Sequence, residues 1–115
     1  MAGFRINRVS EDIRREIISV IRDLKDPRVM GKMLTVVRVE VSSDASYAKV
    51  YVSDIKGIES AREAVKGLTS ATGYIRREVG SNLHLRKTPE LKFVVDDSIE
   101  QGFSMFKKLE ENRGE

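Results

Sequence analysis

The sequence predicts a single α+β domain in which helices cover one face of a three-stranded sheet. The chain has 115 residues, the length of one domain. Three short segments alternate apolar and polar residues as half-buried strands do, and the segments around them carry single apolar stripes with helical spacing. No repeat, linker or low-complexity stretch divides the chain. We therefore expect residues 1–115 to form one domain, with frayed ends at 1–5 and 111–115.

The first predicted element is an Arg-rich amphipathic helix. Its apolar residues recur from Val9 to Leu24, and either Asn7 or Ser10 can cap its start. The helix must end near Pro27, because a residue that precedes proline is driven out of the helical conformation.

Two strands that form an antiparallel hairpin follow this helix. Residues 34–42 alternate, with Val37, Val39 and Val41 on one face, and residues 47–53 alternate in the same way. The four residues between these segments, Ser-Asp-Ala-Ser, have the chemistry of a turn.

The second half of the chain supplies two helices, a third strand and a final helix. Ser60 has capping-box spacing and opens a helix that runs to Leu68, and the apolar pattern restarts after residues 70–73, which predicts a kink. A strand at 90–96 and a helix at 98–110 complete the order. Helix, strand, strand, helix, kink, helix, strand is the type II order of the K-homology (KH) fold, a nucleic-acid-binding architecture.

The composition argues against an enzyme. The chain has no cysteine, which excludes thiol nucleophiles and thiolate metal sites, and His84 is its only histidine. Phosphate-loop signatures are absent. We interpret Asp96 and Asp97 as a helix cap rather than as cation ligands. The sequence therefore predicts no catalytic residue, no metal and no cofactor.

The basic residues are the candidate binding groups. Residues 1–95 carry 18 basic and 12 acidic side chains, and residues 96–115 carry 3 and 6. This excess favours a phosphate-bearing partner, although any single residue can equally be solvated surface. Tyr47 and Tyr51 share a strand face and can either stack on bases or pack. The candidate RNA-binding side chains are Lys25, Arg28, Lys32, Arg76, Arg77, Arg86 and Lys87.

The usual KH clamp is missing. KH domains hold a nucleotide backbone with a GXXG loop between two helices. No two of the eight glycines here are three residues apart, and the junction reads Ser70-Ala71-Thr72-Gly73. Any RNA contact must therefore be made in another way.

Several segments form a distinctive combination of motifs: Lys25-Asp26-Pro27-Arg28, the strands Thr35–Asp44 and Ala48–Val52, Ala71–Arg77, Leu85–Phe93 and Asp96–Ser98. Together they resemble the ribosome-binding factor A (RbfA) family, in family order over residues 4–110. Ala45 departs from that family, which often has leucine there.

This resemblance implies a type II KH-like domain in which an A-x-G kink, with Ser70, Ala71 and Gly73, replaces GXXG. It also implies a ribosome assembly factor that binds the free 30S subunit and 16S rRNA and assists late maturation and processing, including in the cold. No catalysis or cofactor is implied.

We expect a cytoplasmic monomer with no membrane or small-molecule partner, because no apolar run approaches transmembrane length. The alternative is a protein–protein interaction module without direct RNA contact. Charge reversal at Arg76, Arg77 and Arg86 separates these two hypotheses.

Overall fold

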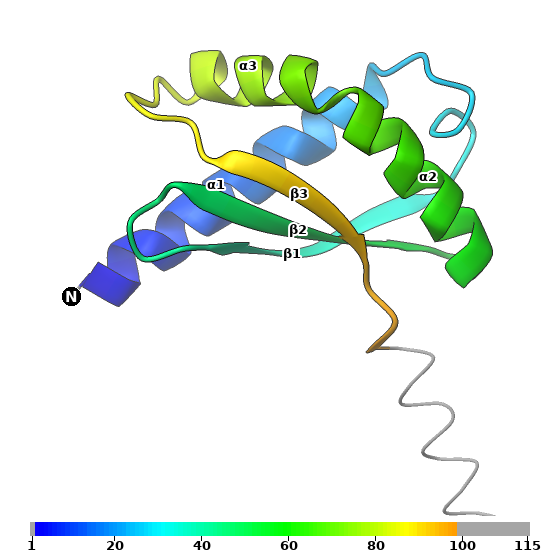
Figure 1. Ribbon diagram of the computed structural model, residues 1–115, viewed down its shortest axis with the longest axis horizontal. Coiled ribbons are helices and arrows are strands. Elements are labelled where there is room, and N and C mark those ends of the chain that lie inside the picture. The colour runs from blue at the N-terminus through cyan, green and yellow to red at the C-terminus, as the bar shows by residue number, and fades with distance from the viewer. Residues whose placement is uncertain (1, 99–115) are drawn as a thin grey trace, which may run out of the picture.

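The computed structural model describes residues 2–98, which form three helices and a three-stranded sheet (Figure 1). This order confirms the predicted one, and the final helix expected at 98–110 lies, apart from its first residue, outside the described residues. The elements are α1 (Ala2–Arg22), β1 (Leu34–Val41), β2 (Tyr47–Asp54), α2 (Ile58–Ser70), α3 (Thr72–Asn82) and β3 (Glu90–Val95).

The sheet has the strand order β1-β2-β3 and is mixed. β1 and β2 pair antiparallel as the predicted hairpin, whereas β2 and β3 pair parallel. Parallel neighbours need a long crossover, and α2 and α3 together supply it. This topology confirms the type II KH-like fold.

The core lies between the helices and one face of the sheet. Along β2, Ala48, Val50 and Val52 are fully buried, and they alternate with partly exposed residues on the opposite face. Ile17 of α1, like Leu68 of α2, is fully buried in the same cluster. Within residues 2–98, the helices therefore cover one sheet face, as predicted.

Strand β1 differs from the strict alternation that the sequence suggested. Val36 and Val39 are buried, whereas Val37 is only partly buried. The pairing register with β2 shifts between Val36 and Arg38, so Val37 is the extra residue of a β-bulge. The prediction that Val37 shares a face with Val39 was wrong because the bulge reverses the alternation at that point.

Two predicted helix starts also differ. α1 begins at Ala2 rather than at Asn7 or Ser10, so neither residue caps its start. α2 begins at Ile58, so Ser60 lies inside the first turn and does not cap it. Ser60 instead donates a hydrogen bond to the buried Asp54 at the end of β2 (Oγ to Oδ2, 2.6 Å).

No helix within residues 2–98 combines the length and the apolar character that crossing a membrane requires.

Candidate nucleic-acid interface

The loop that follows α1, residues 23–33, contains an ion pair between Asp26 and Arg28. Arg28 donates from Nε to Oδ1 (3.0 Å) and from Nη2 to Oδ2 (2.7 Å), and its backbone N–H donates to Oδ1 (2.8 Å). These hydrogen bonds lower the pKa of the Asp26 carboxyl to about 2, and the same contact raises the pKa of Arg28. The guanidinium of Arg28 is therefore already engaged within the protein.

The same loop rests on the last turns of α2. Nη2 of Arg28 also donates to Ser70 Oγ (3.2 Å), and Ser70 Oγ donates to the Lys66 carbonyl (3.1 Å). A Cβ at Gly67 would lie 2.8 Å from Cγ2 of the buried Val29, so only glycine allows the loop to approach this closely. Arg28 and Gly67 thus fix the loop against the end of α2.

The junction between α2 and α3 is a break at Ala71, where the sequence predicted a kink (Figure 1). The Ala71 N–H donates to the carbonyls of Gly67 and Leu68 (3.1 Å each), and its carbonyl accepts from Ile75 (2.9 Å). Two residues after Ala71, Gly73 is exposed, and a Cβ there would meet nothing within 4 Å. Bare backbone therefore faces outward at the start of α3.

Lys32, at the other end of the loop, is a structural residue. Its side chain is only 14% exposed, and Nζ donates to Ser60 Oγ (3.2 Å) and lies 3.5 Å from Glu63 Oε2. Because Ser60 in turn donates to Asp54, Lys32 is the outer member of a chain of contacts that anchors the first turn of α2.

Arg76 fixes the loop that follows α3. Its Nε donates to the Pro89 carbonyl (3.0 Å), and its Nη2 donates to the Thr88 carbonyl (2.7 Å). Gly80 allows the same loop to lie close to α3, because a Cβ there would overlap Thr88 Oγ1. His84 lies exposed in this loop with a positive φ of 53°. Arg76 therefore positions residues 83–89 rather than projecting freely.

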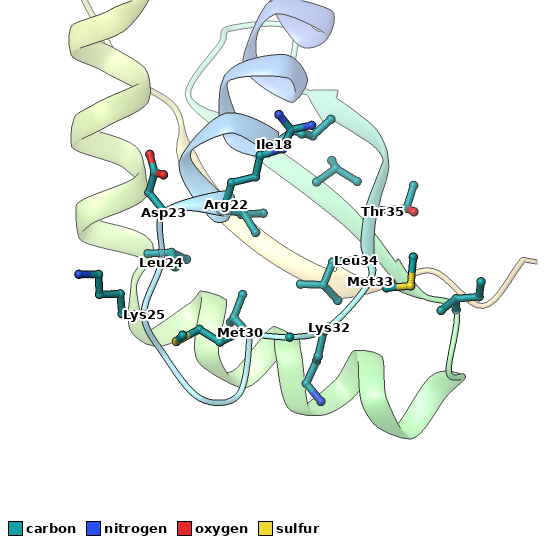
Figure 2. A pocket seen from close by; sticks show the side chains of 15 residues that line it. Ile18, Arg22, Asp23, Leu24, Lys25, Met30, Lys32, Met33, Leu34 and Thr35 are labelled. Atoms are coloured by element: carbon teal, nitrogen blue, oxygen red, sulfur yellow. The ribbon is translucent and has the colours of Figure 1, made fainter.

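Four candidate cations remain exposed and have no hydrogen bond or ion pair with another described residue. Lys25 lies beside the α2–α3 junction (Figure 2). Arg77 lies on α3, and Arg86 and Lys87 lie in the loop after its C-terminal end. The free cations are therefore distributed from one end of α3 to the other. We call Lys25, Arg77, Arg86 and Lys87 the α3 basic track.

Helix α1 adds basic residues that were not among the predicted candidates. Arg8, Arg15 and Arg22 are exposed and seven residues apart, a spacing that places them on one helix face. Arg15 lies 3.5 Å from Glu11, whereas Arg8 and Arg22 have no ion pair within the described part of the chain. The seven-residue spacing was visible in the sequence and could have identified this row.

The tyrosines on the open face of the sheet are differently placed. The Arg38 guanidinium lies 3.8 Å from the centroid of the Tyr51 ring, and the Tyr51 hydroxyl donates to Glu40 Oε2 (3.1 Å). One face of Tyr51 is thus already covered by a cation–π contact. Tyr47 is 38% exposed and shares this strand face.

Nothing in the described residues resembles a metal centre. No group of three or more His, Cys, Asp or Glu side chains within residues 2–98 is placed to hold an ion. Asp96 instead accepts hydrogen bonds from the backbone N–H and the hydroxyl of Ser98 (3.3 and 2.9 Å).

Comparison with known proteins matches the chain to one family. The family model described as ribosome-binding factor A matches residues 5–109. The ribosome-binding factor A of Clostridium tetani is 47% identical over 116 residues, which cover 97% of this chain and 95% of that protein.

Two solved structures from Thermus thermophilus are similar to the chain. The crystal structure of ribosome-binding factor A is 27% identical with a TM-score of 0.68, covering 78% of this chain and 94% of that one. A homology model of the same factor, fitted into a cryo-EM map of a 30S–RbfA complex, is 26% identical with a TM-score of 0.66, covering 80% and 96%. The match over nearly the whole length, on the same KH-like fold, shows that this chain belongs to the ribosome-binding factor A family.

Proposed function

We propose that this protein is a ribosome assembly factor that binds the free 30S subunit through its 16S rRNA and assists late maturation and processing of that subunit, including in the cold. The observation that carries the proposal is the α3 basic track, a set of exposed cations without partners among residues 2–98 on a KH-like frame. The Thermus thermophilus relative fitted into a 30S complex supports the small subunit as the target.

The proposed contacts divide the predicted RNA-binding residues into two groups. Lys25, Arg77, Arg86 and Lys87 bind phosphates directly, because their charges are available to a ligand. The other three candidates hold the surface in place through intramolecular hydrogen bonds; they are Arg28, Lys32 and Arg76.

The kink replaces the glycine loop of other KH domains as the place where RNA backbone comes closest. Gly73 is exposed and has open space where a Cβ would lie, so an RNA strand can approach the backbone at this position, next to the exposed side chain of Tyr74. Lys25 lies beside this junction, and Arg77 lies about one helical turn beyond Gly73 on α3. Recognition then depends on backbone and shape rather than on base edges.

Assistance in maturation requires more than binding. A ligand shifts a conformational equilibrium only by its differential affinity for the two states. The protein must therefore bind an immature conformation of the rRNA more tightly than the mature one. This role needs no catalysis and no cofactor, and it fits a monomer acting in the cytoplasm.

Co-sedimentation tests this proposal. The purified protein is mixed with isolated small subunits, large subunits or complete ribosomes at several salt concentrations. We expect selective binding to free small subunits, with a slope of log affinity against log salt of about −3, because four phosphate contacts each contribute about −0.7 to −0.9. Binding that does not depend on salt concentration would instead favour a protein–protein interaction module. Failure of the protein to co-sediment with any of the particles would refute the proposal.

A further inference from the structure

Tyr74 is an exposed aromatic residue in the first turn of α3. It is 43% exposed, and within residues 2–98 its hydroxyl has no hydrogen-bond partner. No cation from this part of the chain lies over its ring, because both cation–π contacts found there involve Tyr51. An exposed aromatic ring among free cations is typical of proteins that bind single-stranded nucleic acid.

The ring belongs to the outer side of α3. Ile75 and Val79 are fully buried and mark the side of the helix that faces the core. At 3.6 residues per turn, Gly73, Tyr74 and Arg77 fall on the opposite side, and all three are exposed. The outer side of α3 therefore combines an aromatic ring, a free cation and bare backbone.

Tyr74 and Arg77 are close enough to contact one RNA strand together. They are three residues apart on the helix, so their Cβ atoms are separated by about 5–6 Å. Arg77 has no hydrogen bond or ion pair within residues 2–98, so its guanidinium is available to a phosphate. Glu78, the one acidic residue of α3, is half-buried, so the charge that the outer side of this helix exposes is positive.

The two tyrosines that the sequence singled out are less suited to this role. One face of Tyr51 is covered by the Arg38 guanidinium, 3.8 Å from the ring centroid. Tyr47 lies on the sheet face that the helices leave open, and its partner in the register with β3 is the exposed Glu90, whose carboxylate repels phosphates. Tyr74 is therefore the tyrosine that lies among the free cations.

A ring on a helix surface stacks only on a base that is not paired. In an A-form duplex the bases are stacked on one another, whereas loops, bulges and single strands expose bases that aromatic side chains can cover. Such stacking tolerates any sequence, because every base has a π-face. It therefore agrees with recognition that does not read base edges.

We propose that Tyr74 stacks on an unpaired base of the rRNA strand whose phosphates the α3 basic track binds. Arg77 holds a phosphate of that strand while the ring covers a neighbouring base. This inference rests on the proposed function and adds a contact that does not depend on charge.

Co-sedimentation with free small subunits at several salt concentrations separates stacking from charge. Tyr74→Ala should lower the affinity by about five- to 100-fold at every salt concentration, the range that loss of a base–aromatic stack produces. The slope of log affinity against log salt should not change, because tyrosine displaces no counterion. Tyr74→Phe keeps the ring and should bind like wild type. Tyr47→Ala, the matched control on the sheet, should also bind like wild type.

The outcomes separate this inference from the proposed function. If wild type shows salt-dependent binding to small subunits and Tyr74→Ala binds equally well, the inference fails and the proposed function stands. If wild type binds no particle, both fail. Urea denaturation should give the same midpoint for Tyr74→Ala and wild type, because the residue is exposed. A lowered midpoint together with lost binding would assign Tyr74 a structural role and overturn the inference.

Fluorescence gives a direct signature of stacking, because the chain contains no tryptophan. Tyr74→Trp places a single indole on α3, and Tyr47→Trp places one on the sheet. Titration with a short single-stranded RNA should quench the fluorescence of Tyr74→Trp only, and the duplex that this RNA forms with its complement should quench neither variant. No quenching in Tyr74→Trp, or equal quenching in both variants or by both RNAs, would contradict stacking at this position.

Discussion

Replacement of Gly67 by alanine tests how the 23–33 loop is held against α2. The new Cβ would lie 2.8 Å from Val29 Cγ2, 3.1 Å from Arg28 Cβ and 3.3 Å from Asp26 Oδ1. Val29 is only 4% exposed, so it cannot simply rotate into solvent. Overpacking of this kind costs about 1–3 kcal/mol, whereas glycine to alanine inside a helix gains about 0.5–1 kcal/mol. We therefore expect Gly67→Ala to lower the free energy of unfolding by up to about 2.5 kcal/mol, with a central value of roughly 1 kcal/mol.

Gly73→Ala is the matched control, because Gly73 is also helical but has open space around its Cα. That change should leave the free energy of unfolding unchanged or raise it by up to about 1 kcal/mol. Urea denaturation followed by circular dichroism measures both variants. If Gly67→Ala proves as stable as Gly73→Ala, the close packing of the loop on α2 is not a feature of the molecule in solution.

Three further predictions concern charged side chains. The pKa of Asp26 is lowered from 3.8 to about 2, so the contribution of its carboxylate to stability is complete above pH 3.8 and is lost as the pH falls toward 2. The difference in urea midpoint between wild type and Asp26→Asn should therefore disappear as the pH falls from 3.8 to about 2. A difference that does not change with pH would contradict this prediction. Arg76→Ala should lower the free energy of unfolding by about 1–2 kcal/mol because two carbonyls lose their donor, whereas Arg77→Ala should change it by less than about 0.5 kcal/mol. Lys32→Ala should destabilise the protein by about 1 kcal/mol without changing the affinity of the folded protein for small subunits. Lys25→Ala should instead lower that affinity and leave the stability unchanged, as paired denaturation and co-sedimentation assays would show. Equal effects of the two substitutions would refute the division into structural and free cations.

The order of the elements within residues 2–98 was predictable because the apolar residues of each element recur with the spacing of a helix or a strand. Alternating valines identify β2, and the apolar stripe through Ile13 and Ile17 identifies α1. The bulge at Val37 was not predictable, since it depends on how β1 pairs with β2 and not on the residues of β1 alone. Ser60 was misassigned for a similar reason, because its partner Asp54 belongs to the preceding strand.

The candidate site was predictable only as a set of charges. The sequence identified seven candidate basic residues, yet it did not separate the engaged cations from the free ones. Arg28 meets Ser70, 42 positions away, and Lys32 meets Ser60, 28 positions away. Partners at such separations are set by the fold, so the division between engaged and free cations emerges only in three dimensions.

A pair of charge reversals tests the central claim that the α3 basic track binds the small subunit. Arg77→Glu/Arg86→Glu changes two members of the track, and Lys56→Glu/Lys92→Glu makes the same change in charge at two other exposed lysines. Co-sedimentation with free small subunits should show an affinity reduced by about tenfold or more for the first variant only, with a salt slope shallower by about 1.5 to 2. Equal losses in both variants would show that only overall charge matters, and full binding by the Arg77/Arg86 variant would contradict the account.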